Sequence, residues 1–119
     1  MAKPVVASVQ GVAISAGLAL VANAHIAVAA QGSSFGLTDI RDGRCHPQIL
    51  HAVARAIGKR RVQELALTGR IFSTPEALSW GLVHASVPPF ELDDRASAIA
   101  TGLANANSSV IRAVLDASR

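Results

Sequence analysis

Asp39 is the acidic side chain that is best placed for chemistry in this sequence. It ends the short apolar segment FGLT (residues 35–38), so its carboxylate is expected to lie beside apolar groups. A carboxylate in such a place can exchange a proton with a bound substrate. An aspartate that accepts hydrogen bonds from the amides of a local turn has the same sequence signature. Both interpretations of Asp39 stay open at this point.

Backbone amides are the second candidate for chemistry. An apolar run over residues 3–9 ends in QG, and the small-residue stretch VAISAGLAL (12–20) follows it. Small residues at a turn between a buried strand and a helix allow a ligand to approach the backbone. The unpaired amides in the first turn of the helix then point at that ligand. Close packing of the helix on the strand is the alternative explanation.

A third group of reactive side chains, Asp42, Cys45, His46 and His51, follows Asp39. Cys45 and His46 are adjacent in the chain, and adjacent residues rarely reach the geometry of a nucleophile and its base. The group also lacks a recognised metal-ligand spacing. We therefore expect neither a cysteine nucleophile nor a metal site here.

The elements that position these residues follow from apolar periodicity and from helix signals. Strands come early and helices late, which indicates an α/β chain with a helical C-terminal part. The pattern predicts strands or extended segments at residues 3–11, 25–29, 34–37 and 82–87. It predicts helices at residues 47–57, 59–68, 74–80 and 92–103, and a last helix capped by Ser108 or Ser109. Gly58 is the expected C-cap of the first of these, and STPE (73–76) is a capping box.

Composition indicates a folded domain with apolar surface to cover. The chain has 119 residues, of which 50% are hydrophobic and 16% charged, so disorder is not expected. Its mean hydropathy of +0.38 is high for a chain of this size. We therefore expect part of the apolar surface to meet another subunit or another part of the fold. Phe72 and Trp80 are expected to lie in the core.

Charge and aromatic content argue against a nucleic-acid partner. The net charge is only +3, and three Phe, one Trp and no Tyr leave few rings for base stacking. The basic residues are scattered except for KRR (59–61), which we interpret as the solvated start of a helix. A contact to an anionic phosphate is the alternative for this triplet.

The single cysteine rules out an internal disulfide and suits a reducing compartment, which favours a cytoplasmic location. The apolar N-terminal region resembles a secretory signal that ends in ANA (22–24) or AVA (27–29), but proline and polar residues interrupt it. Asn23 and His25 argue against a membrane span. We expect this region to be folded core.

Five short motifs, in their order and spacing along nearly the whole chain, resemble the crotonase superfamily of enoyl-CoA hydratase/isomerase proteins. They are KPV (3–5), QG-x-A (10–13) with Gly17, FGLTD (35–39), LTG (67–69) and EA-x5-LV (76–83). The resemblance covers the later half of a typical member. It implies one partial α/β domain of the ClpP/crotonase type over residues 1–119, with the active-site core in 1–43 and a mostly helical part in 44–119.

The resemblance also implies roles for individual residues. The Ala16 amide matches one of two backbone donors that hold the thioester oxygen of an acyl-CoA, which is an oxyanion hole. Ala13, Ile14 and Gly17 belong to the same substrate-binding turn. Asp39 matches the second catalytic glutamate of the family.

Two positions depart from the family pattern. Ala19 replaces the first catalytic glutamate, and an alanine can neither donate nor accept a proton. This loss lowers the expectation of efficient hydration and leaves isomerisation or hydrolysis of a thioester open. His25 stands where an aspartate is common, and we expect a packed, hydrogen-bonded histidine.

The implied function is enoyl-CoA hydratase/isomerase chemistry on acyl-CoA thioesters, a lyase or isomerase activity of fatty acid metabolism. CoA is part of the substrate, and no further cofactor or metal is implied. The implied assembly is a homo-oligomer, a trimer or hexamer, without nucleic acid or membrane. The alternative is a catalytically inactive truncated module that serves binding or assembly.

Overall fold

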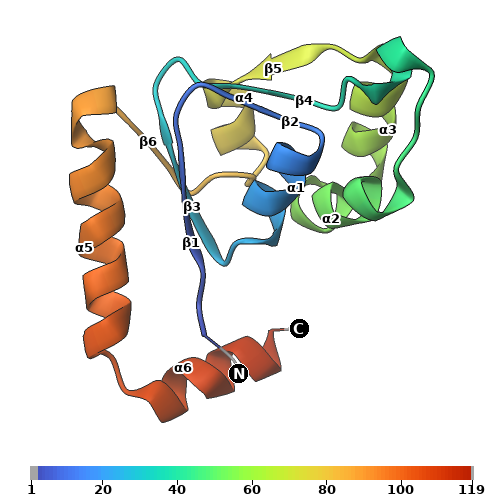
Figure 1. Ribbon diagram of the computed structural model, residues 1–119. Helices are drawn as coiled ribbons and strands as arrows, with labels where there is room; N and C mark the ends of the chain where they lie inside the picture. Colours follow the sequence, from blue (N-terminus) through green and yellow to red (C-terminus); the bar gives the residue numbers. More distant parts are fainter. Residues whose placement is uncertain (1–2, 119) are drawn as a thin grey trace.

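The computed structural model describes residues 3–118, which form two small sheets surrounded by helices (Figure 1). The strands are β1 (Val6–Val9), β2 (Val12–Ile14), β3 (Ile26–Ala30), β4 (Ser34–Gly36), β5 (Ile71–Ser73) and β6 (Ala85–Val87). The α-helices are α1 (Ala16–Asn23), α2 (Pro47–Ile57), α3 (Lys59–Thr68), α4 (Thr74–Ser79), α5 (Leu92–Asn105) and α6 (Ser108–Ala117). Two 3-10 helices are η1 (Asp39–Asp42) and η2 (Pro89–Glu91).

β3 is the central strand of the first sheet, whose order is β1-β3-β6. Both neighbours run parallel to β3, with Val6 opposite Ile26 and Val28 opposite Ala85. Parallel strands need a crossover connection, and α1 lies in the connection between β1 and β3. Alternate residues of β3 enter two different apolar clusters, one on each face of the sheet. This two-sided burial explains why β3 is a continuous apolar run rather than an alternating one.

β4 is the central strand of the second sheet, whose order is β2-β4-β5. β2 runs parallel to it and β5 antiparallel. Gly36 in β4 pairs with Ile14 on one side and Ile71 on the other. A Cβ atom on Gly36 would lie 2.9 Å from the Ile71 Cδ1 atom. The absence of a side chain at Gly36 therefore lets β5 pack closely against β4.

The second sheet corrects the interpretation of residues 12–20 as a turn that leads into a helix. Residues Val12–Ile14 form a strand, and the helix begins only at Ala16. The sequence also predicts no strand at Ile71–Ser73, where the structure has β5. Both strands have three residues, too few for an alternating pattern to be recognised. Their pairing with β4 decides their conformation.

The helices of the middle segment agree with the predictions. α2 ends at Gly58, whose φ is 96°, and α3 begins at the next residue. The capping box before α4 is present: the Glu76 N–H donates to Ser73 Oγ at 3.3 Å, and the Ser73 N–H donates to Glu76 Oε1 at 3.1 Å. The prediction that Ser108 or Ser109 caps α6 is wrong. Asn107 caps this helix, because its Oδ1 accepts from the Ser109 and Val110 amides at 2.9 and 3.3 Å.

The main core lies between the two sheets and the helices α1 to α4. Phe72 and Phe35 are buried and their rings stack at 5.4 Å. Trp80 packs on Phe72 with ring centroids 5.1 Å apart, but it is only partly buried. The prediction that Trp80 is a core residue therefore holds only in part. Two arginines lie over its ring, with Arg61 5.2 Å and Arg70 5.7 Å from the ring centroid.

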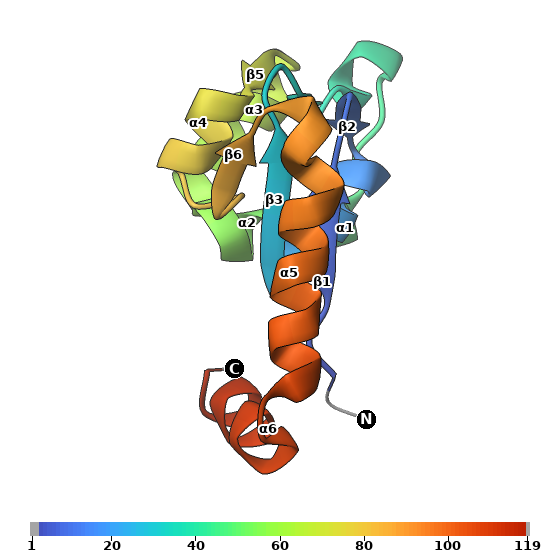
Figure 2. The ribbon, with the colours of Figure 1, turned by 90° about the vertical axis from the view of Figure 1, so that its left-hand side faces the viewer.

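α5 covers the opposite face of the first sheet and lies along β1 and β3 (Figure 2). It buries Leu92, and Ile99 packs on the small cluster of Val28, Ala30 and Val87. α6 then turns away below the sheet and buries no residue (Figure 1). Val110 and Val114 on α6 are each 59% exposed. Within residues 3–118, no helix has the length and apolar character that a membrane crossing requires.

Candidate active site

Ser15 forms the turn between β2 and α1 in an unusual backbone conformation. Its φ is 50° and its ψ is −110°, and it is the only residue other than glycine with a positive φ in the described chain. Two backbone hydrogen bonds hold it in this conformation. Its N–H donates to the Gly36 carbonyl at 3.0 Å, and its carbonyl accepts from the Ala19 N–H at 3.0 Å. The turn is therefore fixed to β4 on one side and to α1 on the other.

Ala16 is the first residue of α1 and is exposed. Among the described residues, no hydrogen-bond acceptor is found for its N–H. The first amides of a helix have no partner within the helix, and they carry the positive end of its dipole. The Ala16 amide is thus available to an anionic or partly charged oxygen.

The other three residues of the predicted turn differ in their surroundings. Ile14 is 41% exposed, and a Cβ atom placed on Gly17 would meet no atom within 4 Å. Both positions border open space beside Ala16. Ala13 is different, because its side chain is 8% exposed and belongs to the core. Any contact of Ala13 with a ligand would have to come from its backbone.

Asp39 lies at the start of η1 and is partly buried. Its Oδ1 accepts a hydrogen bond from the Ser15 hydroxyl at 2.9 Å, across 24 residues of sequence. The side chain gives η1 no cap, and its hydrogen bond goes to the turn before α1. This geometry differs from the local turn aspartate that was the alternative interpretation. The structure brings Asp39 to the turn that also carries Ala16.

η1 is anchored to the loop that follows α3. The Arg41 guanidinium donates to the Gly69 carbonyl at 2.6 Å. Gly69 has a φ of 66°, and a Cβ atom there would lie 3.0 Å from Ile40 Cγ2. The glycine therefore allows a left-handed helix end and the close approach of η1. Arg41 positions the segment that bears Asp39, and sequence analysis did not identify it.

Asp39 also lines a cavity of about 530 Å³ between η1, α2 and α3. Most of the cavity wall is apolar, with a few polar groups among its lining residues. The lining residues are Leu37, Asp39, Ile40, Arg44, Cys45, His46, Leu50, Val62, Gln63, Ala66 and Leu67. Ala16 does not line this cavity. Asp39 is the connection between the cavity and the turn.

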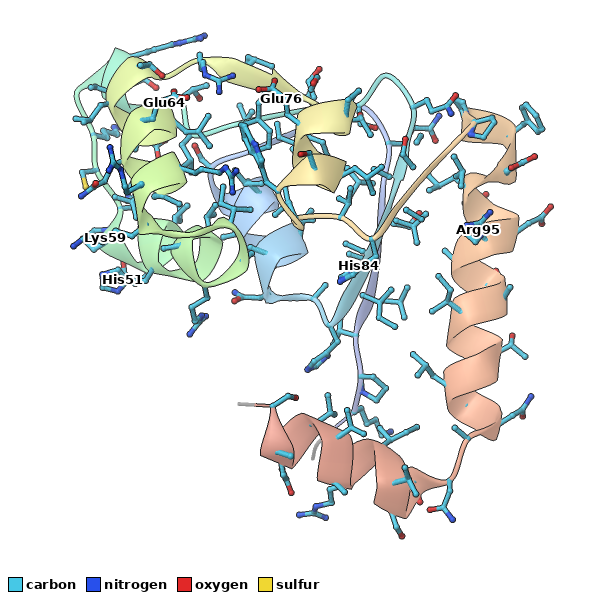
Figure 3. All side chains as sticks on the ribbon, turned by 180° about the vertical axis from the view of Figure 1, so that it is seen from behind. His51, Lys59, Glu64, Glu76, His84 and Arg95 are labelled. Carbon is cyan, nitrogen blue, oxygen red and sulfur yellow. The ribbon has the colours of Figure 1, made fainter. Side chains whose placement is uncertain are left out.

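The reactive side chains after Asp39 do not form a cluster. Within residues 3–118, no three His, Cys, Asp or Glu side chains are grouped so that they could hold a metal ion. Cys45 is an exposed free thiol, and Cys45 and His46 lie on the cavity wall while Asp42 does not. His51 is exposed on α2 (Figure 3).

Ala19 and His25 complete the set of residues singled out by sequence. Ala19 lies in α1, partly buried, and supplies no carboxylate there. His25 accepts a hydrogen bond at Nδ1 from the Val5 N–H at 2.8 Å. The prediction of a hydrogen-bonded histidine is confirmed, but that of a packed one is wrong, because His25 is exposed.

The groups with shifted pKa values lie outside this site. Arg70 forms ion pairs with Glu64 at 2.8 Å and Glu76 at 3.3 Å, and both acids appear on the same side of the molecule in Figure 3. The Arg70 hydrogen bond lowers the pKa of Glu64, and the same bond raises the pKa of Arg70. The Ser73 amide, followed by the Arg70 charge, lowers the pKa of Glu76. These shifts belong to an exposed ion-pair network.

Ser15 is the site residue that sequence analysis did not assign. The signal that could have identified it is the spacing AISAG (13–17), a serine between small residues where a strand passes into a helix. This signal is weak alone. It becomes meaningful only when the 2.9 Å contact with Asp39 is known.

Known proteins with the same architecture are found in sequence and in structure. A family model described as enoyl-CoA hydratase/isomerase matches residues 1–119. The chain is 33% identical over 115 residues to mevalonyl-coenzyme A hydratase sidH from Aspergillus fumigatus, covering 96% of this chain and 43% of that protein. It is 37% identical over 108 residues to the mitochondrial enoyl-CoA hydratase domain-containing protein 3 from Rattus norvegicus, covering 91% and 36%.

Solved structures give the same result. An enoyl-CoA hydratase/isomerase family protein from Silicibacter pomeroyi superposes with a TM-score of 0.89 at 35% identity, over 92% of this chain and 47% of that one. A Legionella pneumophila protein assigned to the enoyl-CoA hydratase/isomerase (crotonase) class superposes with a TM-score of 0.94 at 28% identity, over 98% and 45%.

The chain therefore belongs to the enoyl-CoA hydratase/isomerase family and has the α/β fold of the crotonase superfamily. Both predictions made from the five sequence motifs are confirmed. The chain spans less than half the length of each of these four relatives.

Proposed function

We propose that this chain acts on acyl-CoA thioesters by enoyl-CoA hydratase/isomerase chemistry. The observation that supports this most directly is the hydrogen bond between Ser15 and Asp39. It brings Asp39, the candidate acid, to the turn that also carries Ala16. Family membership supplies the substrate class. CoA enters as part of the substrate, and we propose no further cofactor. We also propose a cytoplasmic location.

The Ala16 N–H would donate to the thioester oxygen. Negative charge grows on this oxygen when an enolate forms, and the N-terminus of α1 favours that charge. Asp39 would remove or deliver the proton at the carbon that reacts. The apolar cavity beside Asp39 has a suitable lining for an acyl chain.

Ala19 shifts the proposal towards isomerisation. Hydration of a double bond uses two carboxylates around one water, whereas a double bond can be moved by one acid/base group. The chain presents Asp39 and has alanine at the other position. We therefore propose double-bond isomerisation as the more efficient reaction of this site.

Asp39→Asn tests the proposed acid/base role. Turnover of crotonyl-CoA and of a β,γ-unsaturated isomer should fall about 100-fold, because the amide cannot exchange a proton. Calorimetric binding of acetyl-CoA should remain, since Asn keeps the size of the side chain. Asp93→Asn, on the exposed start of α5, is the matched control and should retain activity. Full turnover by Asp39→Asn would contradict the role.

Ala16→Pro tests the amide, because proline removes the N–H at a helix position that tolerates it. We expect turnover to fall by about 100-fold, as for the loss of one oxyanion donor. Ser108→Pro makes the same change at the first residue of α6 and should leave turnover unchanged. Because Ser15 has an unusual conformation before this position, circular dichroism must show that the variant is folded. Unchanged turnover in a folded variant would exclude Ala16 as the donor.

An inactive binding or assembly module is the second candidate. The alanine at position 19 and the exposed valines of α6 favour it. We propose a homo-oligomer in either case, because the helices leave apolar residues uncovered. Light scattering gives the mass in solution alongside the titration. Acyl-CoA binding without turnover would support the inactive module, and turnover would exclude it.

A further inference from the structure

We propose that Ser15 is a nucleophile that takes the acyl group from the thioester, so that the site also cleaves acyl-CoA by way of an acyl-serine. This inference rests on the proposed binding of acyl-CoA at the Ala16 turn. Proton transfer at carbon does not need the Ser15 hydroxyl, whereas this inference gives that hydroxyl a reaction of its own.

The first observation is the placement of the hydroxyl. Ser15 stands on a sharp turn from β2 into α1, with φ 50° and ψ −110°, inside the spacing AISAG. A nucleophilic serine on a strained strand-to-helix turn, with small residues two positions before and after it, is a recurring arrangement for acyl transfer. The neighbouring amide then serves as an oxyanion donor. Here that residue is Ala16, whose N–H has no acceptor among the described residues.

The second observation is the partner of the hydroxyl. Ser15 Oγ donates to Asp39 Oδ1 at 2.9 Å, which is the distance required between a nucleophile and its base. Both side chains are partly buried, and Asp39 borders an apolar cavity of about 530 Å³. The nucleophile Ser15 and the oxyanion donor Ala16 thus come from the turn between β2 and α1, and the base Asp39 comes from η1.

The third observation is the absence of a competing acid. Position 19 in α1 is an alanine, which can neither exchange a proton nor hold a water molecule by charge. The hydroxyl of Ser15 is the nucleophile that the structure places against Asp39. The departure that weakens hydration therefore leaves acyl transfer intact.

The reaction proceeds in two balanced steps. In the first, Ser15 Oγ forms a bond to the thioester carbon and its proton passes to Asp39, while the Ala16 N–H holds the oxyanion. The C–S bond then breaks, and the CoA sulfur leaves with the electron pair and takes the proton from Asp39. In the second step, water attacks the ester, Asp39 accepts its proton, and the C–Oγ bond breaks. The Ser15 oxygen takes that proton back from Asp39, and the carboxylic acid is released.

Butyryl-CoA is the probe that tests this step, because it has no double bond to hydrate or move. The experiment uses the full chain, and peptide mapping distinguishes an acyl group on Ser15 from one on the exposed Cys45 thiol, which lies on the cavity wall. Free CoA is measured by a thiol reagent, and peptide mass spectrometry locates the acyl group. We expect one acyl group on Ser15 and release of CoA.

Three substitutions separate nucleophilic from structural roles. Ser15→Ala and Ser15→Gly should both lose the adduct and reduce CoA release by at least about 100-fold, as for the loss of a catalytic group. Ser15→Cys should restore the adduct as a thioester. Ser79→Ala, an exposed serine at the end of α4, is the matched control and should behave like the parent chain.

The outcomes distinguish this inference from the proposed function. If butyryl-CoA binds and crotonyl-CoA is converted, but no acyl group is found on Ser15 and CoA release does not depend on it, the inference is wrong and the proposed function stands. If neither thioester binds in calorimetry, both are wrong. Adduct formation that persists in Ser15→Ala would also overturn the assignment.

Discussion

Ser15 combines two properties that work against each other at the scale of a single residue. Its side chain reaches Asp39, while its backbone occupies a region in which residues with a Cβ atom are disfavoured. Such a conformation costs about 1–3 kcal/mol and persists only where the surroundings hold it. The hydrogen bonds to Gly36 and from Ala19 supply that restraint.

A pair of substitutions at position 15 measures this backbone strain. Ser15→Ala and Ser15→Gly both remove the hydroxyl contact with Asp39, so their difference reports the backbone alone. Glycine adopts a φ of 50° without a clash, and we expect Ser15→Gly to be more stable than Ser15→Ala by roughly 1–2 kcal/mol after the entropy cost of glycine. Urea unfolding followed by circular dichroism gives both values. Equal stabilities would show that the backbone relaxes when the hydroxyl is lost.

The position of Asp39 could be predicted from sequence, because the FGLTD motif carries it. Its contact with Ser15 could not, since the two residues are 24 positions apart. That contact depends on the register of β2 on β4, and β2 was not predicted. The role of Arg41 is hidden for the same reason, because its partner Gly69 is 28 residues away.

At the scale of elements, α4 shows how a short helix is fixed by its first turn. The helix has six residues, and its capping box satisfies amides that would otherwise lack partners. Glu76 accepts from the Ser73 N–H and also pairs with Arg70, and these contacts lower its pKa below the ordinary value of 4.5. Its charge therefore stabilises the folded state.

The pH dependence of stability follows from the sign of this shift. A carboxylate whose pKa is lower in the folded state contributes stability above its unfolded pKa, and that contribution is lost as pH falls through the folded pKa. We expect the thermal midpoint to fall as the pH decreases below 4.5, and Glu76→Gln to remove part of that fall. Gln keeps the acceptor for Ser73, so the substitution tests the charge. Glu91→Gln in the exposed η2 is the control, and an identical pH profile for the Glu76 and Glu91 variants would refute the argument.

The elements differ in how well their sequences define them. α3 has the predicted bounds, because apolar spacing, an entry glycine and an exit glycine all agree. α4 was predicted by its capping box. β2 and β5 were missed because three residues carry almost no periodic signal, and sheet partners from distant segments determine them. Asn107 was missed as a cap because two serines directly follow it.

At the scale of the whole molecule, the core is unevenly distributed. The aromatic pair of Phe35 and Phe72 lies within the second sheet and belongs to the main core, whereas α5 and α6 bury little. The radius of gyration is 14.8 Å, compared with about 13.5 Å for a compact domain of this length. α6 lies away from the sheets and lengthens the molecule (Figure 2).

Two phenylalanines test this distribution. Phe72 is 1% exposed, and Phe72→Ala should cost about 3–5 kcal/mol of unfolding free energy because it leaves a cavity beside Phe35 and Trp80. Phe90 is 82% exposed, so Phe90→Ala should change stability by less than about 0.5 kcal/mol. Both values come from urea unfolding. Similar losses for the two variants would mean that Phe90 is covered in solution, and the oligomer mass would then be measured for each.

The parallel pairing of β2 with β4 has a consequence for folding kinetics. The turn with Ser15 and the segment with Asp39 meet only after the intervening crossover of α1 and β3 has closed. Closing this loop costs chain entropy before the long-range contacts can stabilise it. β4 in turn pairs with β5, nearly 40 residues further along, as Ser34 opposite Ser73 shows. The helices α2 and α3 contain their own local contacts and can form early. The site is therefore expected to appear in the last phase of folding, so that a probe of acyl-CoA binding during refolding would lag behind the helical circular dichroism signal.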